Sequence, residues 1–252
     1  MKRSRSNLVL TTLATLSLLG LFASSAFADA YVVYGATGKV GSLIVEEALE
    51  RGHTVVGVSR NPDNIEIEHE NFSAVQGDVT DVDSIVSTVQ GADAVIVSVG
   101  GVGSGNTPEE AYAYLGALAY IEAASQLGNE TPYLVQVGSG TTLNTDGVRV
   151  FETLNPEPGT YQHGLYQGHW LALEAYRVSS GFEWTVLSAA YGAIRAGLDG
   201  EYMGRYRLGD QETLFDRNGS SMLSAADYAV AIIDMAESHT VTGKRVAVGP
   251  PY

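Results

Sequence analysis

The stretch Ala30-Tyr-Val-Val-Tyr-Gly-Ala-Thr-Gly-Lys-Val-Gly41 decides the fold. Its first five residues, 30–34, are a short apolar run that predicts a buried strand. Gly35, Gly38 and Gly41 follow at a spacing of three, and the residues after them carry apolar side chains at helical spacing. A strand, a glycine-rich turn and a helix in this order are typical of a dinucleotide site, because glycines let the backbone approach a pyrophosphate at the helix N-terminus.

The same alternation of strand and helix patterns continues along the chain. Strands are expected at residues 30–34, 54–59, 72–76, 94–98, 133–137, 184–189 and 244–249, and helices at 40–51, 82–89, 107–127, 169–178 and from Ser224 onward. A capping box of Thr107 and Glu110 is expected to open the third helix. Near-continuous apolar strands separated by helices predict an α/β fold, a doubly wound parallel sheet covered on both faces. We expect one such domain over residues 29–252.

Residues 1–28 differ from the rest and predict a secretory signal peptide. They combine three basic residues, an apolar run from Leu8 to Phe22 and the small residues Ala26 and Ala28 around Phe27. Threonines, a serine and a glycine interrupt the apolar run, which is shorter than the ~20 residues of a membrane span. We therefore expect cleavage after Ala28, no stable membrane anchor afterwards, and a periplasmic or secreted protein.

The charge and cysteine content exclude several classes of partner and site. The 252 residues include 14 Lys and Arg against 29 Asp and Glu, a net charge of −15, and no cysteine. Without the leader's three basic residues the balance is 11 against 29, or −18. Such an acidic chain is a poor partner for nucleic acid. Without cysteine there is no disulfide, zinc-thiolate site or thiol nucleophile. We expect a small-molecule partner and no metal site, and the oligomeric state stays open.

The glycine-rich turn and the ends of the next strands supply candidate cofactor-binding residues. The second strand ends at Arg60, where an NAD-binding protein places a carboxylate on the ribose hydroxyls. Because a guanidinium suits a 2′-phosphate, NADP is predicted, with NAD as the alternative; a solvated surface cation is the other interpretation of Arg60. Asp78 is a candidate for the adenine edge, although it also fits an ordinary turn. The full candidate set is Gly35, Thr37, Gly38, Lys39, Val40, Gly41, Arg60, Asp78, Val79 and Gly100.

These residues resemble a known family. The first turn with Arg60, Gly77-Asp-Val79 and Ala92-Asp-Ala-Val95 are similar to the atypical short-chain dehydrogenase/reductases. The C-terminal segments 206–210 and 218–229 are similar to NmrA-like NAD(P)H-binding proteins often described as NADH-flavin reductases, which are relatives of biliverdin reductase B. The resemblance covers essentially all of the chain after the leader. It implies a Rossmann fold, a nicotinamide cofactor, and a flavin or another planar conjugated acceptor as substrate.

The resemblance is weaker for the catalytic residues. Typical members of the superfamily use a Ser after the fifth strand and a Tyr-x-x-x-Lys pair on the next helix. Ser139 and Tyr166 match, but Trp170 stands where the Lys is expected. Without that cation a tyrosine keeps a pKa near ~10 and is a poor base at neutral pH. We therefore expect Ser139, Tyr166 and His169 as catalytic residues, with His163 as a second candidate proton donor; packing of both histidines is the alternative.

Three functions remain open on the sequence. The first is an NAD(P)H-dependent reductase of a flavin, quinone or similar conjugated molecule. The second is an exported isomerase or lyase on the same fold, which Trp170 favours. The third is a nucleotide-binding protein without turnover. Around the substrate, Tyr191 after the sixth strand is a candidate lining residue, and the long connection 141–159 is a candidate lid.

Overall fold

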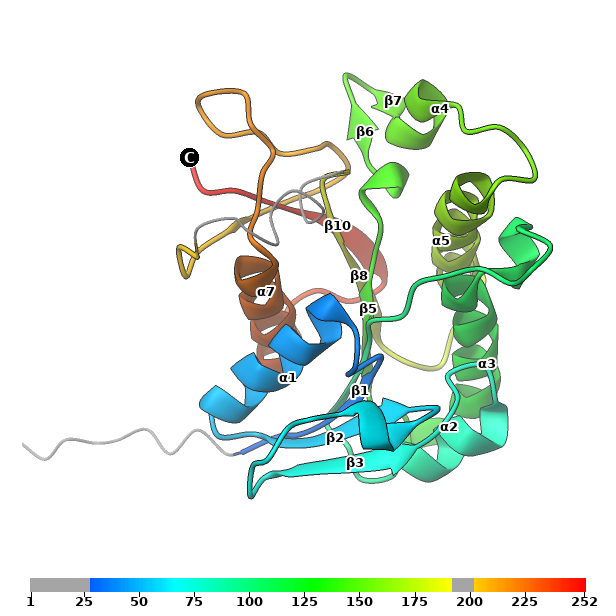
Figure 1. Ribbon diagram of the computed structural model, residues 1–252, viewed down its shortest axis with the longest axis vertical. Helices are drawn as coiled ribbons and strands as arrows, with labels where there is room; N and C mark the ends of the chain where they lie inside the picture. The colour runs from blue at the N-terminus through cyan, green and yellow to red at the C-terminus, as the bar shows by residue number, and fades with distance from the viewer. Residues whose placement is uncertain (1–27, 192–201) are drawn as a thin grey trace, which may run out of the picture.

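The computed structural model describes residues 28–191 and 202–252, so the predicted leader, up to residue 27, lies outside the described residues. An eight-stranded sheet runs through the molecule in the order β3-β2-β1-β4-β5-β8-β10-β9 (Figure 1). Its strands are β1 (Ala30–Tyr34), β2 (Thr54–Ser59), β3 (Phe72–Gln76), β4 (Ala94–Val97), β5 (Tyr133–Val137), β8 (Trp184–Ala189), β9 (Arg207–Gly209) and β10 (Lys244–Gly249). Every neighbouring pair is parallel except β10 with β9. The predicted doubly wound parallel sheet is confirmed, with one antiparallel edge strand added.

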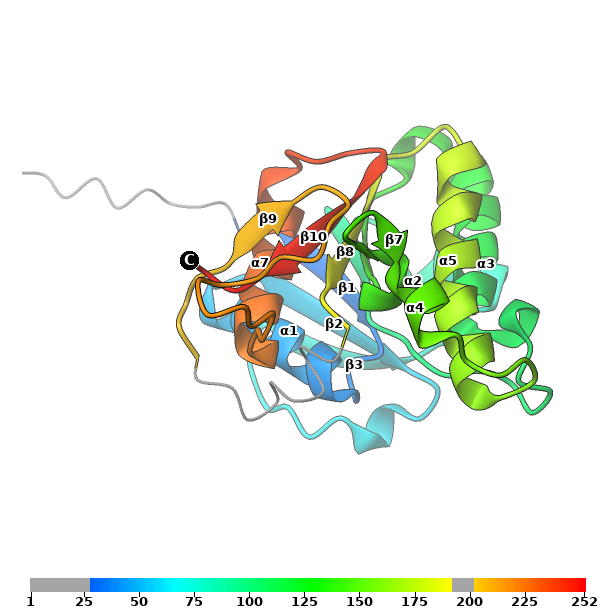
Figure 2. The ribbon, with the colours of Figure 1, turned by 90° about the horizontal axis from the view of Figure 1, so that it is seen from above.

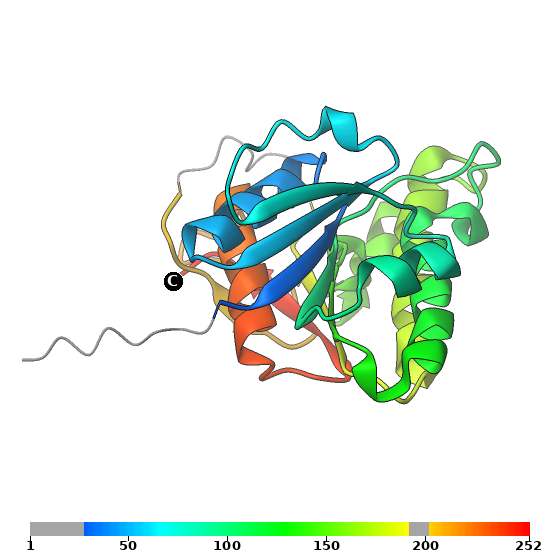
Figure 3. The same cartoon turned by 90° about the horizontal axis from the view of Figure 1, so that it is seen from below.

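Helices cover both faces of this sheet, and each face has its own core (Figure 3). The helices are α1 (Lys39–Glu50) and α7 (Ala225–Ser238) on one face, and α2 (Val82–Thr88), α3 (Tyr112–Leu127) and α5 (Tyr161–Val178) on the other. Strand β1 shows the alternation that fills both cores. Its residues Tyr31 and Val33 pack with α1 and α7, whereas Val32 and Tyr34 pack with the opposite helices. Among the described helices, none combines the length and the apolar character needed to cross a membrane.

Short elements occupy several connections, and all of them except η3 lie at the carboxyl end of the sheet, where α4 and β7 are seen in Figure 2. They are the single turns η1 (Pro62–Asn64), η2 (Pro108–Glu110), η3 (Gly128–Glu130) and η4 (Gly140–Thr142), the hairpin of β6 (Asn144–Thr145) with β7 (Val148–Arg149), and the helix α4 (Val150–Leu154). The connection 141–159 is therefore folded. A bridge between Asn144 and Glu212 joins it to the segment after β9.

The predicted start of the third helix is wrong. Pro108–Glu110 forms only one tight turn, and Ala111 returns to extended backbone with φ −68° and ψ 129° before α3 begins at Tyr112. Thr107 makes no side-chain cap, and the Glu110 carboxylate accepts a hydrogen bond from the Gly105 amide at 2.7 Å instead. The capping-box pattern is present in the sequence, but the Glu110 carboxylate binds the Gly105 amide in the preceding loop instead of the start of a helix.

The fourth predicted helix begins eight residues earlier than expected, at Tyr161. Thr160 caps it, because its Oγ1 accepts a hydrogen bond from the His163 amide at 3.3 Å. Gly164 and Gly168, which lower helix propensity, are there because a Cβ on either would lie within 2.5 Å of the η2 connection. By contrast, the predicted start of α7 is confirmed, since Ser224 accepts from the Asp227 amide at 2.9 Å.

Candidate nucleotide-binding and substrate site

The candidate site begins where β1 turns into α1. Strand β1 lies between β2 and β4, and the helices after β1 and β4 go to opposite faces of the sheet. A crevice opens at such a switch point, outside the carboxyl ends of the strands. Gly35 has φ +82°, and a Cβ there would lie 2.2 Å from the Ser98 carbonyl oxygen. A Cβ on Gly41 would lie 2.0 Å from the Gly35 carbonyl oxygen, so both positions need glycine for α1 to lie this close.

The N-terminus of α1 is suited to an anion. Gly38 is the N-cap residue and carries no side chain that could accept a hydrogen bond from the first turn. The first helical hydrogen bond runs from the Ser42 amide to the Gly38 carbonyl at 2.8 Å. The amide donors before Ser42 therefore lack a capping side chain, and the helix dipole adds partial positive charge. A phosphate placed there would be held by backbone donors.

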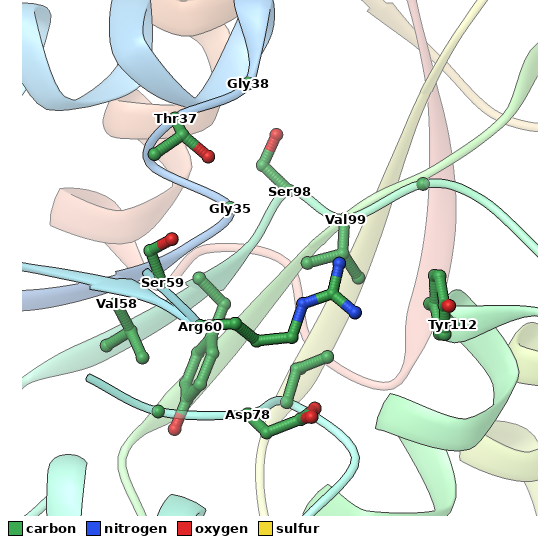
Figure 4. Close-up of a pocket in the computed structure, with 14 residues that line it drawn as sticks. Gly35, Thr37, Gly38, Val58, Ser59, Arg60, Asp78, Ser98, Val99 and Tyr112 are labelled. Carbon is green, nitrogen blue, oxygen red and sulfur yellow. The ribbon is translucent and has the colours of Figure 1, made fainter. Parts of the chain in front are cut away.

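The first cavity lies over this turn and has a volume of about 240 Å³ (Figure 4). It is bounded by the ends of β1 to β4 and by the start of α3. Seven predicted cofactor-binding residues line it: Gly35, Thr37, Gly38, Arg60, Asp78, Val79 and Gly100. Seven further residues also line it: Tyr34, Val58, Ser59, Gly77, Ser98, Val99 and Tyr112. Of these, Tyr112 could have been found only by placing the start of α3 correctly.

Arg60 and Asp78 contribute the charged side chains of this cavity. The Arg60 side chain extends across it, and its Cζ lies 5.4 Å from the centroid of the Tyr112 ring (Figure 4). Asp78 also holds its own turn, because its Oδ1 accepts from the amide and the hydroxyl of Thr80, each at 2.9 Å. The turn role of Asp78 is confirmed by these contacts, and its adenine-edge role stays a prediction for a residue that lines the cavity. Arg60 is exposed and available to a ligand in the cavity.

The second cavity continues from the first and is larger, about 480 Å³. The two cavities share Gly38, Ser98, Val99 and Gly100. Lys39 and Val40 line the second cavity only, and Gly41 lines neither of the two. The rest of its wall comes from the ends of β5 and β8 and from one face of α5: Val137, Gly138, Ser139, Gly140, Tyr161, Gln162, Leu165, Tyr166, His169, Ala189, Ala190 and Tyr191. The structure thus brings Ser139, Tyr166 and His169 together beside the glycine-rich turn.

Comparison with known families agrees with this geometry. A family model described as NAD(P)H-binding matches residues 35–237, from the first glycine of the turn to the end of α7. The chain belongs to the NAD(P)H-binding family. Membership of this family implies a nicotinamide nucleotide as the cofactor. Among the described residues, no three His, Asp or Glu side chains are grouped so that they could hold a metal ion.

Individual relatives of this NAD(P)H-binding protein span nearly its full length. The Bacillus subtilis protein YwnB is 26% identical over 220 residues, 86% of this chain and 96% of its own. A proposed epimerase from Bacteroides thetaiotaomicron is 28% identical with a TM-score of 0.75, covering 89% of this chain and 98% of its own. A proposed exported protein from Burkholderia pseudomallei is 28% identical with a TM-score of 0.70, covering 88% and 99%. SP1627 of Streptococcus pneumoniae, a proposed NADH-flavin reductase, shares the fold at 24% identity and a TM-score of 0.71, covering 89% and 100%.

The three predicted catalytic side chains of this NAD(P)H-binding protein differ in their surroundings. The Ser139 hydroxyl caps η4, accepting from the Thr141 amide at 3.3 Å and bonding the Thr141 hydroxyl at 2.8 Å. The hydroxyls of Tyr166 and Tyr191 are 3.2 Å apart, and their rings meet edge to face. Burial lowers the pKa of His169 from 6.5 to about 4, so this imidazole is neutral at pH 7. A neutral imidazole can still donate one hydrogen bond.

Trp170, at the expected lysine position, lies outside the second cavity. Its ring has the guanidinium groups of Arg149 and Arg177 nearby, with Cζ 4.4 and 5.5 Å from the ring centroid. Arg149 also lies 4.8 Å from the Phe151 ring, and Phe151 packs edge to face against His163. These contacts fasten the connection 141–159 to α5. No residue of the connection 141–159 lines the second cavity, so the cavity lining does not support the predicted lid. His163 does not line this cavity either, so the same holds for its predicted role as a proton donor.

Proposed function

We propose that this protein is an NAD(P)H-dependent reductase that delivers a hydride to a flavin, a quinone or a similar conjugated small molecule. The observation that carries the proposal is the continuity of the two cavities. A cavity of mixed polarity over the glycine-rich turn passes into a larger, mainly apolar one along Ser98, Val99 and Gly100. A reductase needs such an arrangement, because the nicotinamide end of the cofactor must lie next to the acceptor that receives the hydride.

The residues of the first cavity fit a nicotinamide dinucleotide. The uncapped amides of α1 and the Thr37 hydroxyl would hold the pyrophosphate, and Asp78 and Val79 would border the adenine. Arg60, which has no ion-pair partner among the described residues, would bind a 2′-phosphate, which supports NADP over NAD. At Gly100 an added Cβ would meet nothing within 4 Å, so the backbone there borders open space. When bound, the reduced nicotinamide supplies the hydride.

The second cavity fits a planar, conjugated substrate. Tyr161, Tyr166 and Tyr191 present aromatic surface, and about 480 Å³ is within the usual size of small-molecule sites. The Tyr166 hydroxyl and the neutral His169 ring offer hydrogen bonds to a carbonyl or ring nitrogen of the acceptor. With its pKa near 4, His169 orients the acceptor instead of supplying a proton as an imidazolium at neutral pH.

A second candidate function is an isomerase or lyase. Trp170 replaces the lysine that would lower the pKa of Tyr166, and a relative at 28% identity is a proposed epimerase. The two functions differ in their use of cofactor. A reductase consumes one NADPH for each acceptor reduced, whereas an isomerase or lyase converts substrate with no net oxidation of NADPH.

Turnover measurements test the reductase. The chain beginning at Asp29 is titrated with NADPH and NADH by fluorescence, and NADPH oxidation is then followed with a panel of flavins and quinones. We expect oxidation that depends on the acceptor and that is lost when the aromatic wall is opened by Tyr191→Ala. Tight NADPH binding with no oxidation by any acceptor would leave a non-redox function.

Export is part of the same proposal. The pattern of residues 1–28 supports it, and so does the relative from Burkholderia pseudomallei that is named as an exported protein. Cell fractionation of the full-length chain tests it: the protein should be outside the cytoplasm and lack the leader. Retention of the intact chain in the cytoplasm would contradict export and leave the proposed reduction unaffected.

A further inference from the structure

The chain is anchored at Asp29, at the end of β1 opposite the glycine-rich turn. The backbone nitrogen of Asp29 donates a hydrogen bond to Nδ1 of His53 at 3.2 Å, and its carbonyl accepts from the Thr54 amide at 2.9 Å. His53 is only 3% exposed. The first residue after the predicted cleavage point is therefore held in place by a buried imidazole and by the sheet.

Three carboxylates converge on this point from different elements. Glu237 of α7 binds Nε2 of His53 at 2.8 Å, Asp93 accepts from the Ala30 amide at 2.8 Å, and the Asp29 side chain accepts from the Tyr31 hydroxyl at 2.8 Å. Burial raises the pKa of Tyr31 well above its usual range, and these same three carboxylates raise it further. The end of β1 is therefore a site of concentrated negative charge.

The positive charge near these carboxylates comes from Arg51, which already pairs with three acidic side chains. Arg51 lies 2.7 Å from Glu47, 2.6 Å from Asp234 and 2.9 Å from Glu237. The contacts around Asp29, His53 and Arg51 thus include one guanidinium and five carboxylates. These carboxylates belong to Asp29, Glu47, Asp93, Asp234 and Glu237. A second positive charge at the Asp29 nitrogen would be stabilised by this excess.

We propose that cleavage after Ala28 creates this charge: the freed α-ammonium of Asp29 pairs with His53 and the surrounding carboxylates, and processing thereby completes the native charge balance of the fold. The proposal rests on the export proposed above. It uses the observed contacts of His53, whose Nδ1 accepts from the Asp29 nitrogen at 3.2 Å and whose Nε2 lies 2.8 Å from a carboxylate oxygen of Glu237. In the uncut chain the same nitrogen is a neutral amide, so the carboxylates keep their excess charge.

The sign of the pH dependence follows from the ammonium. An α-amino group ordinarily has a pKa of about 7.7–8.0, and the carboxylates of Asp29, Asp93 and Glu237 favour its charged form in the folded chain. A group whose pKa is raised on folding stabilises the protein below its unfolded pKa, and that stability is lost as pH rises through the folded pKa. The pKa values of Tyr31 and Arg51 are both raised, so neither side chain changes charge in this range.

The test compares two proteins: the chain beginning at Asp29 and the same chain with Gly-Ser-Gly placed before Asp29. Thermal midpoints are measured at pH 6.5 and at pH 10. We expect the chain beginning at Asp29 to melt about 2–4 °C higher at pH 6.5 and the difference to vanish at pH 10. Equal midpoints at pH 6.5, or a difference that persists at pH 10, overturn the proposal, because a steric effect of the extension would not titrate.

Two variants show whether the carboxylates carry the effect. Glu237→Gln, made in both proteins, should shrink the difference at pH 6.5 by at least half, whereas Glu50→Gln on the exposed face of α1 should leave it unchanged. Equal effects of the two substitutions overturn the assignment. Mass spectrometry of the exported chain must also give Asp29 as the first residue; any other N-terminus overturns the proposal. Cofactor titration of the two proteins should agree, so a failed reductase assay would not affect this result.

Discussion

The neutral His169 in the second cavity predicts a specific loss of stability in acid. In the unfolded chain a histidine takes up its proton near pH 6.5, whereas burial lowers the pKa of His169 in the folded protein to about 4. Folding therefore opposes protonation of this ring. Stability is full above pH 6.5 and falls as pH falls toward 4, because the unfolded state binds the proton first. The interval from 6.5 to about 4 corresponds to about 3 kcal/mol of lost stability.

Urea unfolding at pH 7, 6, 5 and 4 measures this loss. His169→Gln keeps a hydrogen-bonding side chain of similar size but cannot titrate. We expect the variant to lose about 3 kcal/mol less than the wild type between pH 7 and pH 4. Carboxylates that titrate in the same range are common to both proteins and cancel in the difference. His69→Gln, at an exposed histidine, is the control and should follow the wild type. Parallel pH profiles of wild type and His169→Gln would refute the burial argument.

Three further changes test the two cavities. Arg60→Ala should weaken NADPH binding about 10–100-fold and NADH binding far less, because the lost contact is to a charged phosphate; fluorescence titrations that show equal losses would remove the 2′-phosphate assignment. Gly41→Ala should cost about 3 kcal/mol in urea unfolding, since its Cβ would lie 2.0 Å from a backbone oxygen, while Gly100→Ala, which opens on free space, should unfold like the wild type. Tyr166→Phe should lower kcat/KM for the acceptor about tenfold without changing the Kd of NADPH; a matching loss in cofactor affinity would instead place this hydroxyl at the nucleotide.

The fold was largely predictable because most of the predicted strands are buried on both sides. Continuous apolar runs mark such strands, and all seven predicted strands are present. Strand β9 was missed, since three residues at the sheet edge carry no pattern of their own. The helix starts were less predictable for a different reason. The loop before α3 takes the Glu110 carboxylate, and the glycines of α5 serve its packing against that loop, so tertiary contacts overrode both local signals.

The site was predictable where backbone geometry decides it. The spacing of Gly35, Gly38 and Gly41 encodes a close approach of chain segments, and the structure shows that approach directly. The roles of the individual residues stay predictions. The sequence alone could not show which side chains from distant segments enter the site or how deeply they are buried there. Tyr112 enters the first cavity because α3 begins later than its pattern indicates, and the burial that keeps His169 neutral depends on the assembled α5.

The missing lysine narrows the chemistry that this site can perform. Where the superfamily places a cation beside its tyrosine, this chain has Trp170, turned toward Arg149 and Arg177 and outside the second cavity. His169 is neutral at pH 7, so it adds no charge to replace that cation. Within residues 28–191 and 202–252, Lys39 is the remaining cation that lines the cavity, at the end nearest the glycine-rich turn. A carbonyl that must be protonated as the hydride arrives would find little help here. A flavin or quinone spreads the incoming negative charge over its own ring system and takes its proton from water afterwards, so the electrostatics of the cavity support the proposed acceptors over simple ketones.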